Sequence, residues 1–384
     1  MFAAVVRNIY LLLSLCATAK AASFLAYGTC INPHQVKGIC VQIRECNYLI
    51  NVLTSNLTEE SRTFLTNSQC GRDTSKHFAE EKILVCCPEE FSNRRRTNGT
   101  GQTPGNLLPE PGKCGKAWSN KIIGGNKTGI NEFPWMALIQ YKTGPDEFGF
   151  HCGGSLINAR YVLTAAHCLK HPSLPPRWEL YAVRLGEWDL VQDPDCIFDS
   201  HGLKDCVEPY MDILIDYGIA HPGYIPESND QFNDIALIRL VDSVPTTSGY
   251  IIPICLPLTN KPRTSNVMQV AGWGATESGL SSKVKLKITI NEWNIKQCQN
   301  LYREYGKAIN SHYQLCAGGE KGVDACSGDS GGPLMAMQRL NGRNRYVAIG
   351  IVSYGPTPCG LKGYPGVYTR VDSYMDWIID NLLP

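Results

Sequence analysis

Cysteine is the residue that most constrains how this chain can fold, because the 384-residue sequence contains seventeen of them. Cys16 lies in an N-terminal segment where Arg7 precedes a short apolar run and several alanines follow. This pattern predicts a signal peptide over residues 1–22, cut between Ala19 and Ala22. Its removal leaves sixteen cysteines. An even, high number in a secreted chain predicts disulfides rather than thiol chemistry or zinc.

A small disulfide-rich domain is predicted over residues 29–88. A segment of this size rarely buries enough apolar surface to be stable alone, so three disulfides are its expected support. The adjacent pair Cys86 and Cys87 lacks the Cys-x-x-Cys spacing of structural zinc sites. Apolar spacing predicts helices over residues 46–53 and 59–65. The domain is either an inert spacer or a docking module for partner proteins. Its six cysteines, whose pairing the spacing alone leaves open, are Cys30, Cys40, Cys46, Cys70, Cys86 and Cys87.

Residues 89–121 are predicted to form a linker. From residue 89 the composition shifts to Asn, Thr, Gly and Pro around the basic cluster 94–96, and such a stretch cannot bury enough apolar surface to order itself. The arginine cluster is either a solvated segment or an incidental second cleavage point. Three Asn-x-Ser/Thr sequences are expected glycosylation sites of a secreted chain, at Asn56, Asn98 and Asn126.

Overall charge and hydropathy exclude two classes of function. The formal net charge is +1 and 18% of the residues are charged, so nothing supports nucleic-acid binding driven by bulk charge. No apolar run after the signal peptide is long enough to span a membrane. We therefore expect the mature protein to be secreted and soluble.

An all-β architecture is predicted for residues 122–384. Short apolar runs alternate there with Gly, Pro and Asn turns, which favours barrels over alternating strand–helix units. A single helix is predicted near the end, over residues 374–382. The predicted strands cover residues 135–141, 161–165, 235–240, 268–273, 346–353 and 366–371.

The chemistry of the chain is indicated by the run 324–333, in which Ser330 follows an aspartate and lies between glycines. A serine hydroxyl is a weak nucleophile and needs a histidine base, which in turn needs a group that orients it. His167 ends one apolar run and Asp234 begins another. Each could be structural if it stood alone. In the order His167, Asp234, Ser330 they match a known catalytic triad order.

With these motifs, residues 122–384 resemble a trypsin-like serine protease domain. The resemblance implies a chymotrypsin-like fold of two six-stranded β-barrels, with the triad between them. It also implies an oxyanion hole formed by the backbone N–H groups of Gly328 and Ser330. Ile122 would become the new N-terminus after zymogen cleavage at Lys121, and its ammonium would pair with Asp329.

The resemblance also implies a specificity pocket that takes arginine. Asp324, six residues before Ser330, would form the floor, and Gly355 and Gly366 would form the walls. Ala325 offers no hydroxyl to a lysine ammonium, whereas a guanidinium can still pair bidentately with the carboxylate. We expect cleavage after arginine in preference to lysine. Because the activation site ends in Lys121, we also expect a separate upstream protease.

Residues 29–88 resemble the clip domain of arthropod proteases. This likeness implies the pairs Cys30–Cys86, Cys40–Cys70 and Cys46–Cys87. Matched positions in the protease domain imply Cys114–Cys255, Cys152–Cys168, Cys298–Cys316 and Cys326–Cys359, and the two remaining residues would form Cys196–Cys206.

Within the clip-domain proteases, the segments 186–189, 195–206 and 353–360 are most similar to the easter, Spätzle-processing and prophenoloxidase-activating group. That implies an extracellular cascade in haemolymph or a perivitelline-type fluid. A cytokine-like precursor or prophenoloxidase would be the substrate, an upstream clip protease the activator, and a serpin the inhibitor. One alternative is a catalytically weak cofactor in the same cascade, a class that usually loses the nucleophile. A second alternative is a digestive trypsin, which would not require a tethered regulatory domain.

An acidic loop follows Leu185 and suits calcium, which takes six to eight oxygen ligands. Related clip proteases carry calcium here, which implies a structural Ca²⁺ held by Glu187, Asp189, Asp195 and the Gln192 carbonyl. The alternative is a solvated acidic loop.

Overall fold

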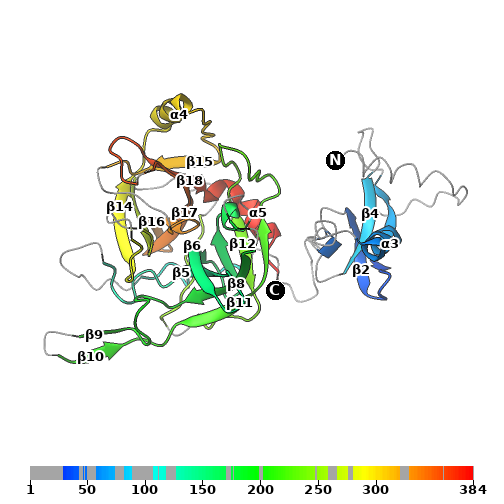
Figure 1. The fold of residues 1–384 in the computed structure, drawn as a ribbon, viewed down its shortest axis with the longest axis horizontal. Helices are drawn as coiled ribbons and strands as arrows, with labels where there is room; N and C mark the ends of the chain where they lie inside the picture. The colour runs from blue at the N-terminus through cyan, green and yellow to red at the C-terminus, as the bar shows by residue number, and fades with distance from the viewer. Residues whose placement is uncertain are drawn as a thin grey trace, which may run out of the picture. The chain divides into compact units, whose positions relative to one another are not determined.

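The computed structural model divides the chain into two compact units, residues 1–95 and 96–384 (Figure 1). The described residues are 29–42, 46, 48–49, 58–73, 82–88, 107–110, 112–117, 127–169, 174–175, 177–198, 202–246, 249–257, 266–275, 280–320, 328–357 and 359–383. Several predictions lie outside them: the signal peptide, the three glycosylation sequences at Asn56, Asn98 and Asn126, the activation bond Lys121–Ile122, and the pocket residues Asp324 and Ala325 with Cys326.

The first unit is a four-stranded antiparallel sheet covered by one helix. Its strands, in the order β1-β2-β4-β3, are β1 (Thr29–Ile31), β2 (Lys37–Gln42), β4 (Lys82–Pro88) and β3 (Gln69–Asp73). Helix α3 (Glu59–Asn67) begins at Thr58, whose hydroxyl accepts a hydrogen bond from the Ser61 N–H. This N-cap satisfies one of the free donors of the first turn.

Disulfides supply much of the interior of this unit. The three expected pairs are present, Cys30–Cys86, Cys40–Cys70 and Cys46–Cys87. Around them Val41, Leu49, Phe64 and Val85 form a small apolar cluster. Residues 59–65 are helical as predicted, and the described part of the other predicted helix is helical only at Tyr48 and Leu49.

The second unit begins with a closed six-stranded barrel (Figure 1). The predicted strands at 135–141, 161–165 and 235–240 are confirmed and belong to it. In ladder order the barrel comprises β11 (Met211–Ala220), β12 (Ala236–Leu240), β7 (Tyr161–Thr164), β6 (Phe148–Leu156), β5 (Met136–Lys142) and β8 (Glu179–Leu185).

A second six-stranded antiparallel sheet contains the other predicted strands. Its order is β14 (Leu286–Asn291), β13 (Val267–Gly272), β16 (Pro333–Leu340), β17 (Arg343–Tyr354), β18 (Gly366–Arg370) and β15 (Gln314–Ala317). A single bridge between Glu292 and Ala317 joins the ends of β14 and β15, so the sheet closes at one end only. The implied second barrel is present in this partly closed form.

One apolar cluster contains residues of both sheets, and another lies within the second sheet. Trp135, beside β5, is fully buried, and its indole N–H lies 3.1 Å from the sulfur of Met335 on β16. This contact joins the barrels near their middle. The chain ends in a short 3₁₀ turn (Val371–Tyr374) and helix α5 (Met375–Asp380), close to the predicted bounds 374–382.

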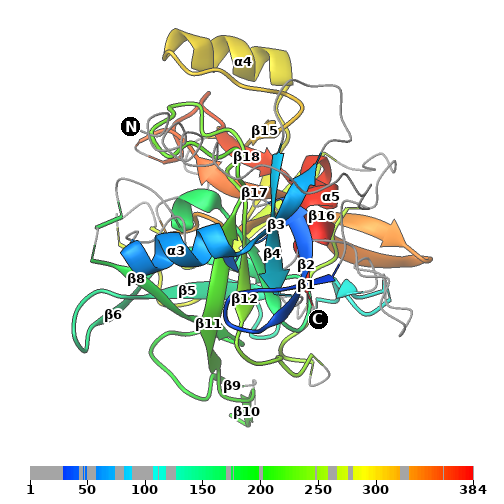
Figure 2. The ribbon, with the colours of Figure 1, turned by 90° about the vertical axis from the view of Figure 1, so that its right-hand side faces the viewer.

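Two features were not predicted. Helix α4 (Ile295–Glu304) lies next to β15, at the top of both views (Figure 2). The hairpin of β9 (Cys196–Phe198) and β10 (Lys204–Cys206) extends from the barrel at the bottom of the same views. In the described part of the chain, no helix has the length and apolar character needed to cross a membrane.

The prediction that residues 89–113 cannot order themselves is wrong at Leu107 and Leu108. Leu107 and Leu108 pack against the protease core, and the Leu107 carbonyl accepts a hydrogen bond from the Asn158 amide. Gly115 donates to Pro253 O at 2.8 Å. Two apolar side chains and a disulfide at Cys114 supply the stabilisation that the average composition does not reveal.

Candidate active site

Asp234 lies completely buried between the two barrels. It precedes β12, and Asn233 before it has a left-handed φ of 60°. Its Oδ1 accepts the His167 backbone N–H at 2.8 Å, and its Oδ2 accepts from the Ser353 hydroxyl at 2.5 Å. The Thr369 hydroxyl donates to its carbonyl at 2.8 Å. A buried carboxylate is tolerated only when it is paired in this way.

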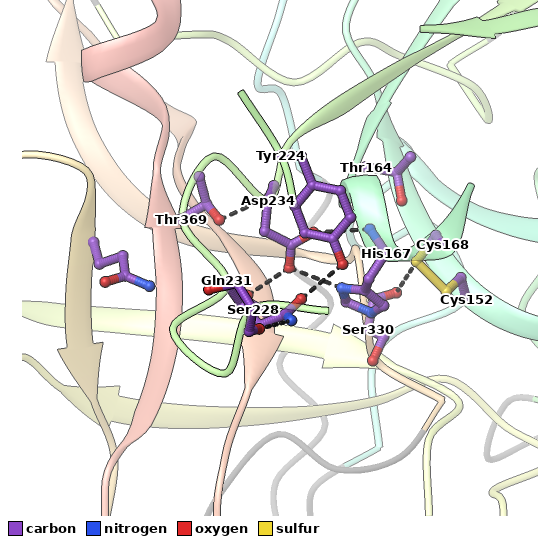
Figure 3. A network of polar contacts seen from close by, with 12 residues as sticks. Cys152, Thr164, His167, Cys168, Tyr224, Ser228, Gln231, Asp234, Ser330 and Thr369 are labelled. Carbon is purple, nitrogen blue, oxygen red and sulfur yellow. Dashed lines mark hydrogen bonds and ion pairs between the residues drawn. A yellow bond between two sulfur atoms is a disulfide. The ribbon is translucent and has the colours of Figure 1, made fainter. Parts of the chain in front are cut away.

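His167 forms the charge partner of this carboxylate. His167 lies in a short 3₁₀ turn, Ala166–Cys168. Its Nδ1 is 2.8 Å from Asp234 Oδ2 (Figure 3). Burial alone would lower the pKa of His167, but the Asp234 charge and hydrogen bond raise it above the ordinary 6.5. Burial alone would raise the pKa of Asp234, but His167 and Ser353 lower it. The pair therefore favours an imidazolium beside a carboxylate.

Ser330 lies near His167, in a turn before β16. Its carbonyl accepts the Gly153 N–H at 2.7 Å and lies 3.8 Å from Cys168 Sγ. That sulfur is within 4.8 Å of a ring nitrogen of His167, so the disulfide Cys152–Cys168 lies next to the His167 ring and the Ser330 backbone. Figure 3 shows Ser330 next to the His167 ring.

Glycine is required after the serine. Gly331 has a φ of 79°, and a Cβ there would collide with the Thr164 hydroxyl and the Gly153 carbonyl. The backbone can therefore approach β6 and β7 closely only without a side chain. Gly328 has a φ of 99°, which also favours glycine. The oxyanion-hole role of Gly328 and Ser330 stays a prediction.

Asp329 points away from Ser330 toward the end of β13. Its Oδ1 accepts the Gly274 N–H at 3.0 Å, and a side chain at Gly272 or Gly274 would collide with its carboxylate. Ile122, the expected partner, lies outside the described residues, so the ion pair also stays a prediction.

Two of the three predicted pocket residues are described. Tyr354 on β17 pairs with Val367 on β18, which places Gly355 and Gly366 opposite each other at the end of this ladder. Cys359 is disulfide-bonded, and its expected partner Cys326 lies outside the described residues. The other four disulfides expected in this unit are present: Cys114–Cys255, Cys152–Cys168, Cys196–Cys206 and Cys298–Cys316.

Sequence reasoning missed four residues that surround the triad. Ser353 and Thr369 hydrogen-bond to Asp234 from the second sheet. Tyr224 packs against Ala166, next to His167, and its hydroxyl donates to Gln231 at 2.7 Å (Figure 3). For Ser353 a signal existed, because it is a polar residue that directly follows the apolar run 349–352. Nothing in the spacing of Thr369, Tyr224 and Gln231 indicated that they lie near the triad.

One set of described side chains has the spacing of a metal site, Cys152, His167 and Cys168. The two cysteines are bonded to each other, and a disulfide offers no thiolate to a metal. The set is therefore part of the triad environment.

The acidic loop brings together two of the expected calcium ligands. The Trp188 N–H donates to Glu187 Oε1 at 3.0 Å and to Asp195 Oδ2 at 2.8 Å. Burial, and then the neighbouring Asp195, raise the pKa of Glu187, and burial raises that of Asp195. Two carboxylates that share one donor repel each other, so an added cation would stabilise them.

Asp189, the third expected acidic ligand, is placed differently. The Asp189 carboxylate accepts from the Val191 N–H at 3.1 Å and the Gln192 amide at 3.0 Å, within its own turn. Among the described residues, no three acidic side chains converge within 4.8 Å. The buried ammonium of Lys285 donates to Glu187 O at 3.3 Å and adds a positive charge below the loop. The Glu187 and Asp195 side chains are thus placed to bind a cation between them. The Asp189 side chain is not part of this pair.

Comparison with known proteins agrees with this geometry. A family model described as Trypsin matches residues 122–378, and one described as the regulatory CLIP domain of proteinases matches residues 30–87. The solved Drosophila Grass clip serine protease of the Toll pathway superposes with a TM-score of 0.63 at 31% identity, covering 92% of this chain and 96% of that one.

Relatives match over nearly the whole length. Serine protease ea of Drosophila melanogaster is 45% identical over 94% of this chain and 93% of its own. The Spaetzle-processing enzyme of the same species is 44% identical over 98% and 99%. Phenoloxidase-activating factor 1 of Holotrichia diomphalia is 41% identical over 94% and 95%. The chain therefore belongs to the trypsin family of serine proteases and carries a regulatory CLIP domain ahead of its protease domain.

Proposed function

We propose that the protein is a secreted serine endopeptidase zymogen that cuts protein substrates after arginine, and less well after lysine. The observation that carries this proposal is the His167–Asp234 hydrogen bond held next to Ser330. In this arrangement Nδ1 is occupied by Asp234, which leaves Nε2 as the base for the serine hydroxyl.

The proposed reaction is acyl transfer. His167 takes the Ser330 proton as the oxygen attacks the peptide carbonyl, and then delivers it to the leaving amine. Asp234 stabilises the imidazolium, in keeping with the raised pKa of His167. The backbone N–H groups of Gly328 and Ser330 receive the developing oxyanion, each donor contributing a factor of about 10²–10³ in rate.

We assign the substrate specificity to Asp324, which would form the floor of a pocket with Gly355 and Gly366 as its walls. Gly355 and Gly366 lie opposite each other, and their lack of side chains would leave room for a long one. Ala325 removes the hydroxyl that would help to bind lysine, whereas arginine can bind the carboxylate through two N–H groups.

Activation is proposed to follow cleavage after Lys121 by an upstream protease. The freed Ile122 ammonium would pair with Asp329, whose carboxylate lies in a close backbone pocket at Gly272 and Gly274. Without its cation a buried carboxylate is costly, so the oxyanion site would form only after the cut.

The biological setting is proposed from the relatives. The names of two of these relatives refer to processing of Spaetzle and to activation of phenoloxidase. We propose an extracellular cascade in which this enzyme acts on a cytokine-like precursor or a prophenoloxidase and is inhibited by a serpin. The alternative, a catalytically weak cofactor, is disfavoured because Ser330 is present.

A structural calcium ion is proposed at the acidic loop. Glu187 and Asp195 would supply carboxylate oxygens, with the Gln192 carbonyl as a further ligand. The ion would add positive charge next to Asp195 and next to Glu187, whose carboxylate also pairs with Arg184 at 3.2 Å. The Asp189 side chain contributes to the turn that shapes this loop.

The test is a comparison of arginine and lysine chromogenic esters. Full-length protein cut only after Lys121 should hydrolyse the arginine ester faster, and Ser330→Ala should abolish turnover. Uncut protein serves as the control for activation. Absence of Ser330-dependent turnover in the cut protein would support the cofactor class instead.

A further inference from the structure

Trp188, at the start of the acidic loop, joins three segments that lie far apart in the sequence. Its indole N–H donates to the carbonyl of Thr128 at 3.0 Å and to its hydroxyl at 3.1 Å. Its carbonyl accepts the Trp273 indole N–H at 3.1 Å and the Lys285 backbone N–H at 2.8 Å. All the polar groups of this residue are therefore engaged, including the backbone N–H that bonds to Glu187 and Asp195.

The first of these segments follows the expected activation bond. Thr128 lies six residues after Ile122 and is completely buried. Its N–H and its hydroxyl both donate to the Lys285 carbonyl at 3.0 Å. Thr128, Lys285 and Trp188 thus form a closed ring of hydrogen bonds. This ring is the first described anchor for the chain that leads back to the new N-terminus.

The second segment leads to the nucleophile. Trp273, almost fully buried, follows β13, and the next residue, Gly274, donates to the Asp329 carboxylate at 3.0 Å. A Cβ at Gly272 or at Gly274 would collide with this carboxylate, so the backbone on both sides of Trp273 lies against Asp329, and a shift of Trp273 would disturb its position. Asp329 precedes Ser330 in the chain. The Trp188 carbonyl therefore supports the wall of the pocket that holds Asp329.

We propose that Trp188 is a positioning residue for the reaction: it fastens the segment behind Ile122 and the backbone around Asp329 to one another, and so stabilises the inserted, active arrangement. The proposal rests on the proposed activation by Ile122. It adds Trp188, which is remote from the triad, as a residue that controls this activation. Loss of its indole hydrogen bonds should shift the cut enzyme toward the form in which the Ile122 amine is free.

The experiment uses the full-length protein, cut after Lys121, with the substitution Trp188→Phe. Phenylalanine keeps an aromatic ring and the backbone contacts but removes the indole N–H. Two quantities are measured: kcat/KM on an arginine ester, and the rate at which cyanate carbamylates the Ile122 amine. We expect kcat/KM to fall about ten-fold, because it follows the fraction of inserted N-terminus. Carbamylation should accelerate by at least this factor if the N-terminus of the unmodified cut enzyme is almost fully inserted, because it follows the remaining free fraction.

Two further variants make the result specific. Thr128→Val removes the hydroxyl from the other side of the contact and should reproduce both changes, and the double variant should add little beyond either single one. Trp377→Phe, in α5, is the matched control and should leave both quantities unchanged. If Trp188→Phe does not fold, Thr128→Val alone carries the test.

The proposal is overturned if Trp188→Phe and Thr128→Val lower thermal stability or activity while the Ile122 amine stays as protected as in the unmodified chain. That outcome leaves the proposed protease function intact. Conversely, absence of Ser330-dependent turnover in the unmodified cut protein would contradict the protease function, whereas a faster carbamylation in the variants would still support the role of Trp188.

Discussion

Ser353 donates a hydrogen bond to the same Asp234 oxygen that accepts from His167, so a residue of the second sheet completes a pair held by the first barrel. Thr369, also from the second sheet, donates to the Asp234 carbonyl. The orientation of His167 therefore depends on how the two barrels pack.

Ser353→Ala should lower kcat/KM on an arginine ester about ten-fold. A hydrogen bond to a charged group is worth about 1.5–3 kcal/mol, and only part of this should appear in the transition state. Steady-state kinetics of the cut protein measures the effect. Ser373→Ala, which removes a hydroxyl contact at His312 outside the triad, is the control and should be neutral. Equal activity of both variants would contradict the assigned role.

The activity of the cut enzyme should fall as the pH decreases through the pKa of His167. This pKa lies above 6.5, and only the neutral imidazole accepts the Ser330 proton, so the active form exists above it. Asp234→Asn removes the charge that raises this pKa. The inflection should then move to lower pH, and kcat should fall by about 10⁴. A profile of kcat/KM from pH 5 to 9 provides the measurement; an inflection that stays in place would count against the pairing.

The clip half should remain attached after activation. Among the described disulfides, Cys114–Cys255 alone joins the two sides of Lys121. On electrophoresis the cut protein should run as one species without reductant and as two with it. The double variant Cys114→Ser, Cys255→Ser should separate without reductant. If the unmodified cut protein separates under non-reducing conditions, the tether is absent.

Calcium should stabilise the folded protein through Glu187 and Asp195. At a free concentration of 100 times its dissociation constant, a ligand that binds only the folded state adds about 2.7 kcal/mol to the free energy of unfolding. Thermal unfolding with calcium and with chelator measures this. Glu187→Gln and Asp195→Asn should remove the response, whereas Asp216→Asn, whose carboxylate pairs with Arg239 elsewhere on the barrel, should retain it. A response unchanged in all three variants would mean that calcium binds elsewhere.

Much of the architecture follows from the sequence because it is encoded locally. The runs at 135–141 and 235–240 are strands as predicted, since apolar residues between turn residues specify strands over a few positions. Helix α4 was missed although Asn294 caps it, because the apolar face of this helix is short. The order of His167, Asp234 and Ser330 already indicated the chemistry.

The strand pattern, the even number of cysteines and the types of residue in the triad could be predicted from the chain, because each depends on short spacings or matched motifs. The folded protein was needed to show which polar groups meet Asp234, that Leu107 and Leu108 pack on the protease core, and that Trp188 contacts Thr128 and Trp273. These contacts join positions separated by tens to hundreds of residues. Their geometry depends on how two closed sheets pack together, which no local pattern records.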